Sequence, residues 1–276
     1  MAIIVPEVFA DAVNARMDVA LRVGKIATDY TDMVEDITTC GDTVNFPVIS
    51  RIEDATTVTK GVALVPDEVN MTDNKAEIKQ VGKAVRIYDK DSAQVKGALK
   101  ERMAEQLGDA MAKAVDADLV AAIKSDALYT EDVDSLLEGT INDAFDVFGD
   151  DVDNDSFAGI IMHSNLRKAI CAMDAFTGKS KTYAAEGNGV VVDGMIGYWN
   201  GTIPVYLSNN GTKVDNKYML AIAKKDALGV VWQKEATIEE EREAKVLATD
   251  IVANELYATK LVHPDGVSVL YVAAAT

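Results

Sequence analysis

Residues 92–124 decide the fold and read SAQVKGALKERMAEQLGDAMAKAVDADLVAAIK. Apolar side chains recur there at every fourth position: Val95, Leu99, Met103, Leu107, Met111, Val115, Leu119 and Ile123. Each step of four overshoots a full helical turn by about 40°, so the apolar stripe winds around the helix and meets different neighbours along its length. We therefore predict a spine helix on the order of 50 Å long. Periodicity alone favours the simpler alternative, a long core helix of an ordinary globular domain.

The preceding segment, residues 42–90, has a β pattern. Apolar residues alternate in DTVNFPV at 42–48, and a second β-rich run covers 76–87. These runs predict a long antiparallel hairpin with an irregular tip over 51–74. Two-stranded ribbons are marginally stable alone, and this one has little apolar side chain with which to form a core. We expect it to lie against another surface, which is the first indication of an obligate assembly.

Residues 6–28, PEVFADAVNARMDVALRVGKIAT, predict an amphipathic helix near the start of the sequence. Its apolar stripe contains Phe9, Val13, Met17 and Leu21. A helix in this position must dock on something to persist. Its own domain and a neighbouring subunit are equally open as the docking partner.

The second half has a mixed α/β texture. We expect short helices at 140–148, with Thr140 as N-cap, and at 164–176. Residues 177–202 are rich in glycine. Strands are expected at 157–162, 203–207, 218–223, 228–233, 248–262 and 267–273. The acidic run at 239–243 is interpreted as an exposed charged face.

Composition limits the function. The 276 residues carry a formal net charge of −18, which opposes the tight phosphate binding that sequence-specific nucleic-acid recognition requires. The two cysteines, Cys40 and Cys171, are far apart and suggest folding in a reducing cytoplasm. No apolar run approaches the ~18 residues of a membrane span, so no membrane partner is expected.

Residues suited to catalysis are few. The two histidines and two isolated cysteines form no recognisable zinc motif, and no serine sits in a nucleophile elbow. The aspartates at 150–155 are spaced like a calcium loop, but Ser156 and Met162 stand where glycine and glutamate are required. We expect no catalytic, metal-binding or cofactor-binding residue. A soluble α/β enzyme that uses His163, next to Ser164, is kept as a remote alternative.

Five segments carry a resemblance to a known family when taken in order. They are PEVFADAVNARMDVALRVGKIATDYTD (6–32), GDTVNFPVISRIEDA (41–55), GYWNGTIPVYLSN (197–209), KYMLAIAKKDALGVV (217–231) and YATKLVHPDGVSVL (257–270). Together they resemble the major capsid proteins of tailed bacteriophages with the Hong Kong 97 (HK97-like) fold. No single segment is diagnostic, and the specificity lies in their order and spacing.

The resemblance implies an α+β fold with four parts. Residues 1–41 would be an N-terminal arm, and 42–90 an extended β-hairpin (E-loop) lying over an adjacent subunit. A peripheral domain with the spine helix would comprise 91–145 and 251–276. An axial α/β domain would comprise 146–250.

The implied function is structural. Copies of the chain would self-assemble into pentamers and hexamers of an icosahedral shell that encloses double-stranded DNA without sequence-specific binding. The protein would be assembled in the host cytoplasm, with a separate scaffolding protein and a portal, and would reside in the virion. The candidate inter-subunit contacts are Phe9, Val13, Met17, Arg51, Lys60, Val62 and Glu68. The hypothesis rests on the arm and the hairpin being completed by other copies. An encapsulin-like nanocompartment holding enzyme cargo is the alternative with the same fold.

Overall fold

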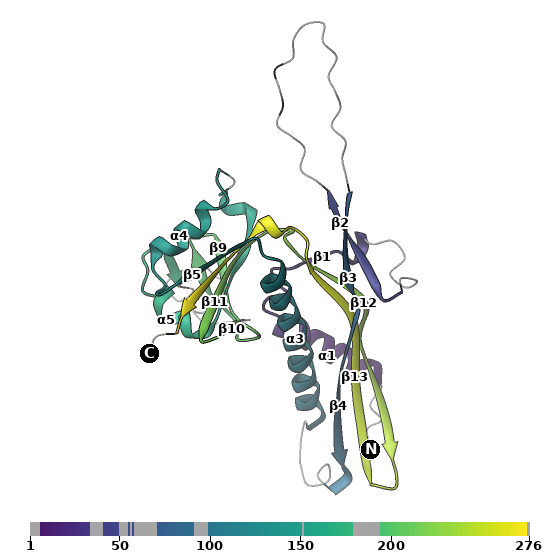
Figure 1. The fold of residues 1–276 in the computed structure, drawn as a ribbon. Helices are drawn as coiled ribbons and strands as arrows, with labels where there is room; N and C mark the ends of the chain where they lie inside the picture. The colour runs from purple at the N-terminus through teal and green to yellow at the C-terminus, as the bar shows by residue number, and fades with distance from the viewer. Residues whose placement is uncertain are drawn as a thin grey trace, which may run out of the picture.

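The computed structural model describes residues 6–33, 41–49, 55, 57, 71–90, 99–150, 152–178 and 194–274. They form two β-sheets with a long helix between them, and a separate two-stranded ribbon (Figure 1). Helices and strands do not alternate in regular βα units, so the fold class is α+β, as predicted.

The long helix is α3 (Leu99–Asp126), which confirms the predicted spine, although residues 92–98 of that prediction lie outside the described part. Its apolar stripe winds as the spacing of four requires. Leu107 packs with the arm helix and the first sheet, whereas Leu119 and Ile123 belong to a core that also contains strands of the second sheet. One helix therefore serves several neighbours from different sides.

The first sheet has the strand order β1-β12-β13-β4. Its strands are β1 (Thr28–Asp29), β12 (Leu228–Glu243), β13 (Ala248–Leu261) and β4 (Lys79–Tyr88). Strands β12 and β13 form a long antiparallel hairpin, β4 runs antiparallel to β13, and β1 runs parallel to β12. Helix α1 (Pro6–Ala20) packs against β12, and α3 packs against β13 and β4.

The second sheet has eight strands, in the order β5-β14-β11-β6-β9-β8-β7 with β10 paired to β11. They are β5 (Tyr129–Val133), β14 (Val267–Ala273), β11 (Lys217–Lys224), β6 (Phe157–Met162), β9 (Ile203–Leu207), β8 (Met195–Trp199), β7 (Phe176–Gly178) and β10 (Lys213–Val214). Both faces of the central strands are covered, because Ile160 and Ile161 belong to two different cores.

The ribbon consists of β2 (Thr43–Ile49) and β3 (Met71–Glu77), paired antiparallel. An antiparallel hairpin is therefore present as predicted, with its first strand in the predicted place, but its second strand lies mostly in the segment predicted as the irregular tip. The prediction that its second arm extends through 76–87 is wrong, because β4 leaves the ribbon and pairs with β13. In Figure 1 the ribbon stands at one end of the first sheet.

Strand pairing corrects the expected domain limits. Strand β4 was expected in the hairpin at 42–90 and β12 in the axial domain at 146–250, but both pair with β13 in the first sheet. Strand β14 and helix α4 (Glu138–Asp146), both expected in the peripheral domain, contribute to the core of the second sheet. Backbone hydrogen bonding between distant strands sets these limits, and local patterning does not reveal it.

Two helix predictions need correction. Thr140 is the third residue of α4 and not its N-cap; its hydroxyl accepts a hydrogen bond from the N–H of Leu137 at 3.0 Å. The helix expected over 164–176 is a 3-10 turn (Ser164–Leu166) and a single turn of helix α5 (Arg167–Ile170), before the chain turns into β7. Further 3-10 turns cover Thr31–Met33, Asn154–Ser156 and Pro264–Gly266.

Candidate assembly surfaces

Helix α1 docks on its own chain. Phe9, Val13 and Met17 are 6, 0 and 5% exposed and pack against α3 and the first sheet. Gly108 allows α3 to approach closely, because a Cβ there would come within 2.9 Å of the carbonyl oxygen of Val13. Of the two docking partners left open for this helix, the structure shows its own domain, and burial leaves these three side chains little surface for a neighbouring subunit. They complete the part of the spine stripe that contains Leu107 and Met111, and so they belong to the core.

A buried carboxylate holds the segment after α1. Asp116, 1% exposed, accepts hydrogen bonds from the backbone N–H groups of Arg22 (3.2 Å), Val23 (2.9 Å) and Gly24 (3.1 Å). Burial raises the pKa of Asp116, and these hydrogen bonds act in the opposite direction. Three consecutive amides that point at one side chain cannot continue the helical pattern. This is why α1 ends at Ala20, well before its predicted end.

The base of the ribbon is anchored in the same chain. Val44 and Phe46 are fully buried, and the Phe46 ring meets the Tyr30 ring edge-on, with centroids 5.8 Å apart. Further members of this core are Ala76, Val231, Ala258 and Val262. The ribbon therefore lies against another surface, as predicted, but at its base that surface belongs to the same chain and not to a neighbouring subunit. The remaining four candidate contacts lie outside the described residues: Arg51, Lys60, Val62 and Glu68.

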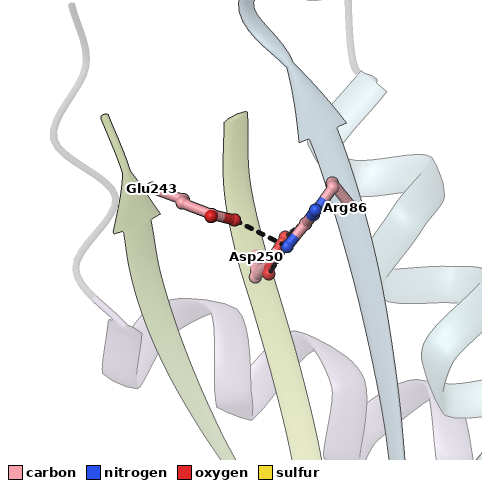
Figure 2. A network of polar contacts seen from close by, with 3 residues as sticks. All are labelled: Arg86, Glu243 and Asp250. Atoms are coloured by element: carbon pink, nitrogen blue, oxygen red, sulfur yellow. Dashed lines mark hydrogen bonds and ion pairs between the residues drawn. The ribbon is translucent and has the colours of Figure 1, made fainter. Parts of the chain in front are cut away.

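The far end of the first sheet carries ion pairs across three strands (Figure 2). Arg86 of β4 donates to both carboxylate oxygens of Asp250 of β13, at 2.7 Å each, and to Glu243 of β12 at 2.8 Å. Beside them, Arg242 of β12 donates to Asp89 at 2.6 Å. Hydrogen bonds from the two arginines lower the pKa of Asp250 and of Asp89. These groups are open to solvent, so the network fixes strand alignment more than it stabilises the fold.

Exposed apolar side chains lie at the same end of the sheet. Tyr88, Val246, Leu247 and Val252 are 46, 41, 61 and 36% exposed. Leu247 adopts φ 53° in the turn between β12 and β13, and its carbonyl accepts a hydrogen bond from the Asp89 N–H at 3.0 Å. Four exposed apolar side chains near one end of a hairpin that ion pairs hold in place make this end a candidate docking surface. We call these four residues the sheet tip.

Sequence reasoning missed the sheet tip. The acidic run at 239–243 was interpreted only as an exposed face, and these residues are indeed exposed. The signal that could have found the tip is a pair of apolar residues in a polar turn: Val246 and Leu247 follow a run of charged residues, where apolar side chains are unusual.

His163 is engaged in holding the backbone. Its Nδ1 accepts a hydrogen bond from the N–H of Asn165 at 3.1 Å, and its ring stacks on Tyr218 with centroids 4.5 Å apart. Burial, assisted by the charge of Lys213, lowers the pKa of the imidazole. The backbone N–H of Ser164 donates a hydrogen bond to Oδ1 of Asn209 at 3.1 Å. The geometry of this residue is that of a cap for the turn at Ser164–Leu166, as is common for a histidine at the end of a strand.

Among the described helices, none is long and apolar enough to cross a membrane. Within the described ranges, no three His, Cys, Asp or Glu side chains gather in a way that could hold a metal ion. Of the aspartates considered for calcium, Asp155 is paired with Lys225 at 3.2 Å.

Comparison with known proteins gives the same answer from sequence and from structure. A family described as phage capsid protein matches residues 72–270. The chain is 26% identical over 262 residues to the major capsid protein of Staphylococcus phage phiMR11, covering 94% of this chain and 89% of that protein.

Solved structures show the same fold at low sequence identity. A chain from Gordonia phage Cozz matches with TM-score 0.63 and 12% identity over 92% of this chain and 86% of that one. The capsid of a native GTA particle matches with TM-score 0.66 and 9% identity, over 92% and 91%. A virus-like particle from Pyrococcus furiosus matches with TM-score 0.59 and 14% identity, over 96% and 98%.

The family match runs from the second strand of the ribbon to the last strand of the second sheet, so it includes both sheets and the spine. This chain therefore belongs to the phage capsid protein family, the structural proteins of the viral shell, and it has the HK97-like fold.

Proposed function

We propose that this chain is the major capsid protein of a tailed bacteriophage and assembles into the pentamers and hexamers of an icosahedral head. The match that covers both sheets, the spine and most of the Staphylococcus phage relative carries this proposal. The protein would be assembled in the host cytoplasm with the help of a separate scaffolding protein and a portal, and the finished shell would be part of the virion.

The geometry supports assembly from preformed rigid subunits. Helices α1 and α3 and the first sheet share cores, so the subunit carries its own interior. The ribbon and the sheet tip lie at opposite ends of this body (Figure 1). Two docking elements that extend from opposite ends of one body suit a tile that must contact several neighbours in a closed surface.

The charge of the chain suits a container for DNA. With a net charge of −18, the subunit as a whole repels the phosphate backbone. We infer that double-stranded DNA is enclosed without sequence-specific contacts. A wall that bound its contents tightly would slow filling.

The proposal includes the absence of an enzymatic role. The one residue considered for catalysis, His163, uses its Nδ1 as the acceptor for a backbone N–H and its ring face for Tyr218. The His163→Asn variant is therefore expected to leave assembly intact and to remove no activity.

Electron microscopy of the purified chain, alone and with its scaffolding protein, tests the proposal. We expect rings of five or six subunits, tubes or closed shells. A monomer that persists under every assembly condition would contradict it. Because the Pyrococcus furiosus virus-like particle has the same fold, particle contents decide between the two container functions: DNA for a phage head, and enzyme cargo for an encapsulin-like nanocompartment.

A further inference from the structure

Glu255 is a buried carboxyl group without a partner. It is 0% exposed on β13, and neither of its carboxylate oxygens has a hydrogen-bond partner among the described residues. The burial pattern of β13 places it on the same face as Ala253 and Tyr257. Ala253 packs in a core with α1 and α3, and the Tyr257 hydroxyl reaches α3. Glu255 therefore lies in the seam between the helix layer and the first sheet, where an ionised carboxylate is strongly disfavoured.

The sheet is irregular opposite this residue. The pairing of β12 with β13 shifts there, so that Glu235 and Ala236 both stand opposite Glu255. The side-chain amide of Asn14 in α1 donates to the Ala236 carbonyl at 3.4 Å, and the Oδ1 of Asn14 is also buried without a partner. A β-bulge interrupts the ladder locally. The contact between α1 and the first sheet therefore includes buried polar atoms that lack hydrogen-bond partners: Oδ1 of Asn14 and the carboxylate oxygens of Glu255.

The charged groups on the surrounding elements leave Glu255 without compensation. The Tyr257 hydroxyl donates to Asp118 of α3 at 2.9 Å, and Lys79 of β4 pairs with the other oxygen of Asp118 at 2.9 Å. The titratable groups next to Glu255 along the strand pairing are exposed: Lys83 of β4, and Lys234 and Glu235 of β12. Asp18 of α1 is exposed as well.

We propose that Glu255 acts as a proton-operated latch: the seam between the α1–α3 layer and the first sheet stays closed only while this carboxyl group holds a proton. With the proton bound, the side chain is neutral and the seam stays closed. Loss of the proton leaves a buried charge, and opening of the seam at the β12 bulge relieves it. Helix α3 also packs with the second sheet through Leu119 and Ile123. The latch therefore controls how firmly the two sheets are held together.

The direction of the pH dependence follows from the burial. Burial raises the pKa of Glu255 from 4.5 to about 7. Between these values the folded chain keeps a proton that the unfolded chain has lost, so the contribution of this proton to stability falls as pH rises through the window. The full difference changes the unfolding equilibrium constant by up to about 300-fold. Asp89 and Asp250, whose pKa values are lowered, titrate below this window.

Urea unfolding of the purified subunit across about pH 5 to pH 8 tests the latch. Between these two pH values we expect the unfolding constant of the natural chain to rise about 70-fold more than that of Glu255→Gln, whose side chain is neutral and has the same shape. Glu240→Gln removes one exposed carboxylate from the same sheet and should keep the natural profile. Hydrogen exchange should show faster opening in α1 and α3 at high pH in the natural chain than in Glu255→Gln.

Two results would overturn the proposal. One is an equal pH slope for Glu255→Gln and the natural chain. The other comes from the natural chain alone, so it does not depend on whether the variant folds: a ¹³C-labelled glutamate titration in which every glutamate carboxyl titrates below about pH 5. Both measurements use free subunits, so their outcome is independent of whether the chain builds a phage head.

Discussion

Replacing Phe46 with alanine tests whether the ribbon belongs to the subunit or to an interface. Phe46 is fully buried at the base of the ribbon and meets Tyr30 edge-on. Truncation of a buried phenylalanine costs about 3–5 kcal/mol through lost burial and the cavity left behind. Typical domains have about 5–15 kcal/mol of stability in total, so the free subunit should lose a large part of its unfolding free energy.

The assay is urea unfolding of the unassembled subunit, followed by tryptophan fluorescence. Phe46→Leu, which keeps most of the volume, should cost less than about 1.5 kcal/mol. Met33→Ala removes a side chain that is 64% exposed and should change stability by less than about 0.5 kcal/mol. If Phe46→Ala left the free subunit unchanged and weakened only assembled shells, the ribbon base would be packed by a neighbour, and the assignment to the intrinsic core would be refuted.

Three further predictions concern the arm, the sheet tip and the hairpin. Asp116→Asn should destabilise the subunit by about 2–3 kcal/mol in chemical denaturation, because it weakens the hydrogen bonds from three backbone amides to a charged acceptor. The control Asp109→Asn, which removes a half-exposed ion pair with Arg16, should cost less than about 1 kcal/mol. Equal losses in the two variants would contradict the role of Asp116 in holding the segment after α1. Leu247→Asp should change the unfolding free energy of the free subunit by less than about 0.5 kcal/mol, because the side chain is exposed. It should raise the protein concentration required for assembly about tenfold or more, as measured by light scattering. An unchanged assembly curve would exclude the sheet tip as an interface. Replacing residues 51–69 with a short turn keeps both strands of the ribbon, β2 and β3. The subunit should stay folded, whereas the assembled shell should lose stability in electron microscopy and thermal denaturation. An unfolded subunit would show that this stretch belongs to the core.

Periodicity in the sequence was sufficient for the spine and for the buried strands. The steps of four in α3 and the apolar runs of β6 and β14 reflect burial of the same chain positions that the structure shows buried. Such patterns depend only on the spacing of apolar residues along the chain, so they predict an element without knowledge of the elements it packs against. The order of elements then carried the resemblance to capsid proteins.

Long-range pairing could not be read in this way. Strand β4 has a strand pattern whichever neighbour it takes, so its transfer from the ribbon to β13 has no local signal. Asp116 and Glu255 are both buried carboxyl groups, yet in sequence they are ordinary acidic residues in a helix and a strand. Their roles depend on three amides from residues 22–24 in one case and on the absence of any described donor in the other.

The docking of α1 changes the argument for assembly without weakening its conclusion. Sequence reasoning made the container hypothesis depend on an arm and a ribbon that find partners only on other copies. The structure instead buries Phe9, Val13 and Met17 inside the subunit, and the chain is nevertheless a capsid protein by its family match. Self-association therefore requires surfaces that are left over after the subunit has satisfied its own core. Leu247, exposed at a braced turn, meets that description, and Phe46 does not. A subunit that is complete in itself can fold before it assembles, so that stability of the monomer and strength of the shell can be altered by different residues.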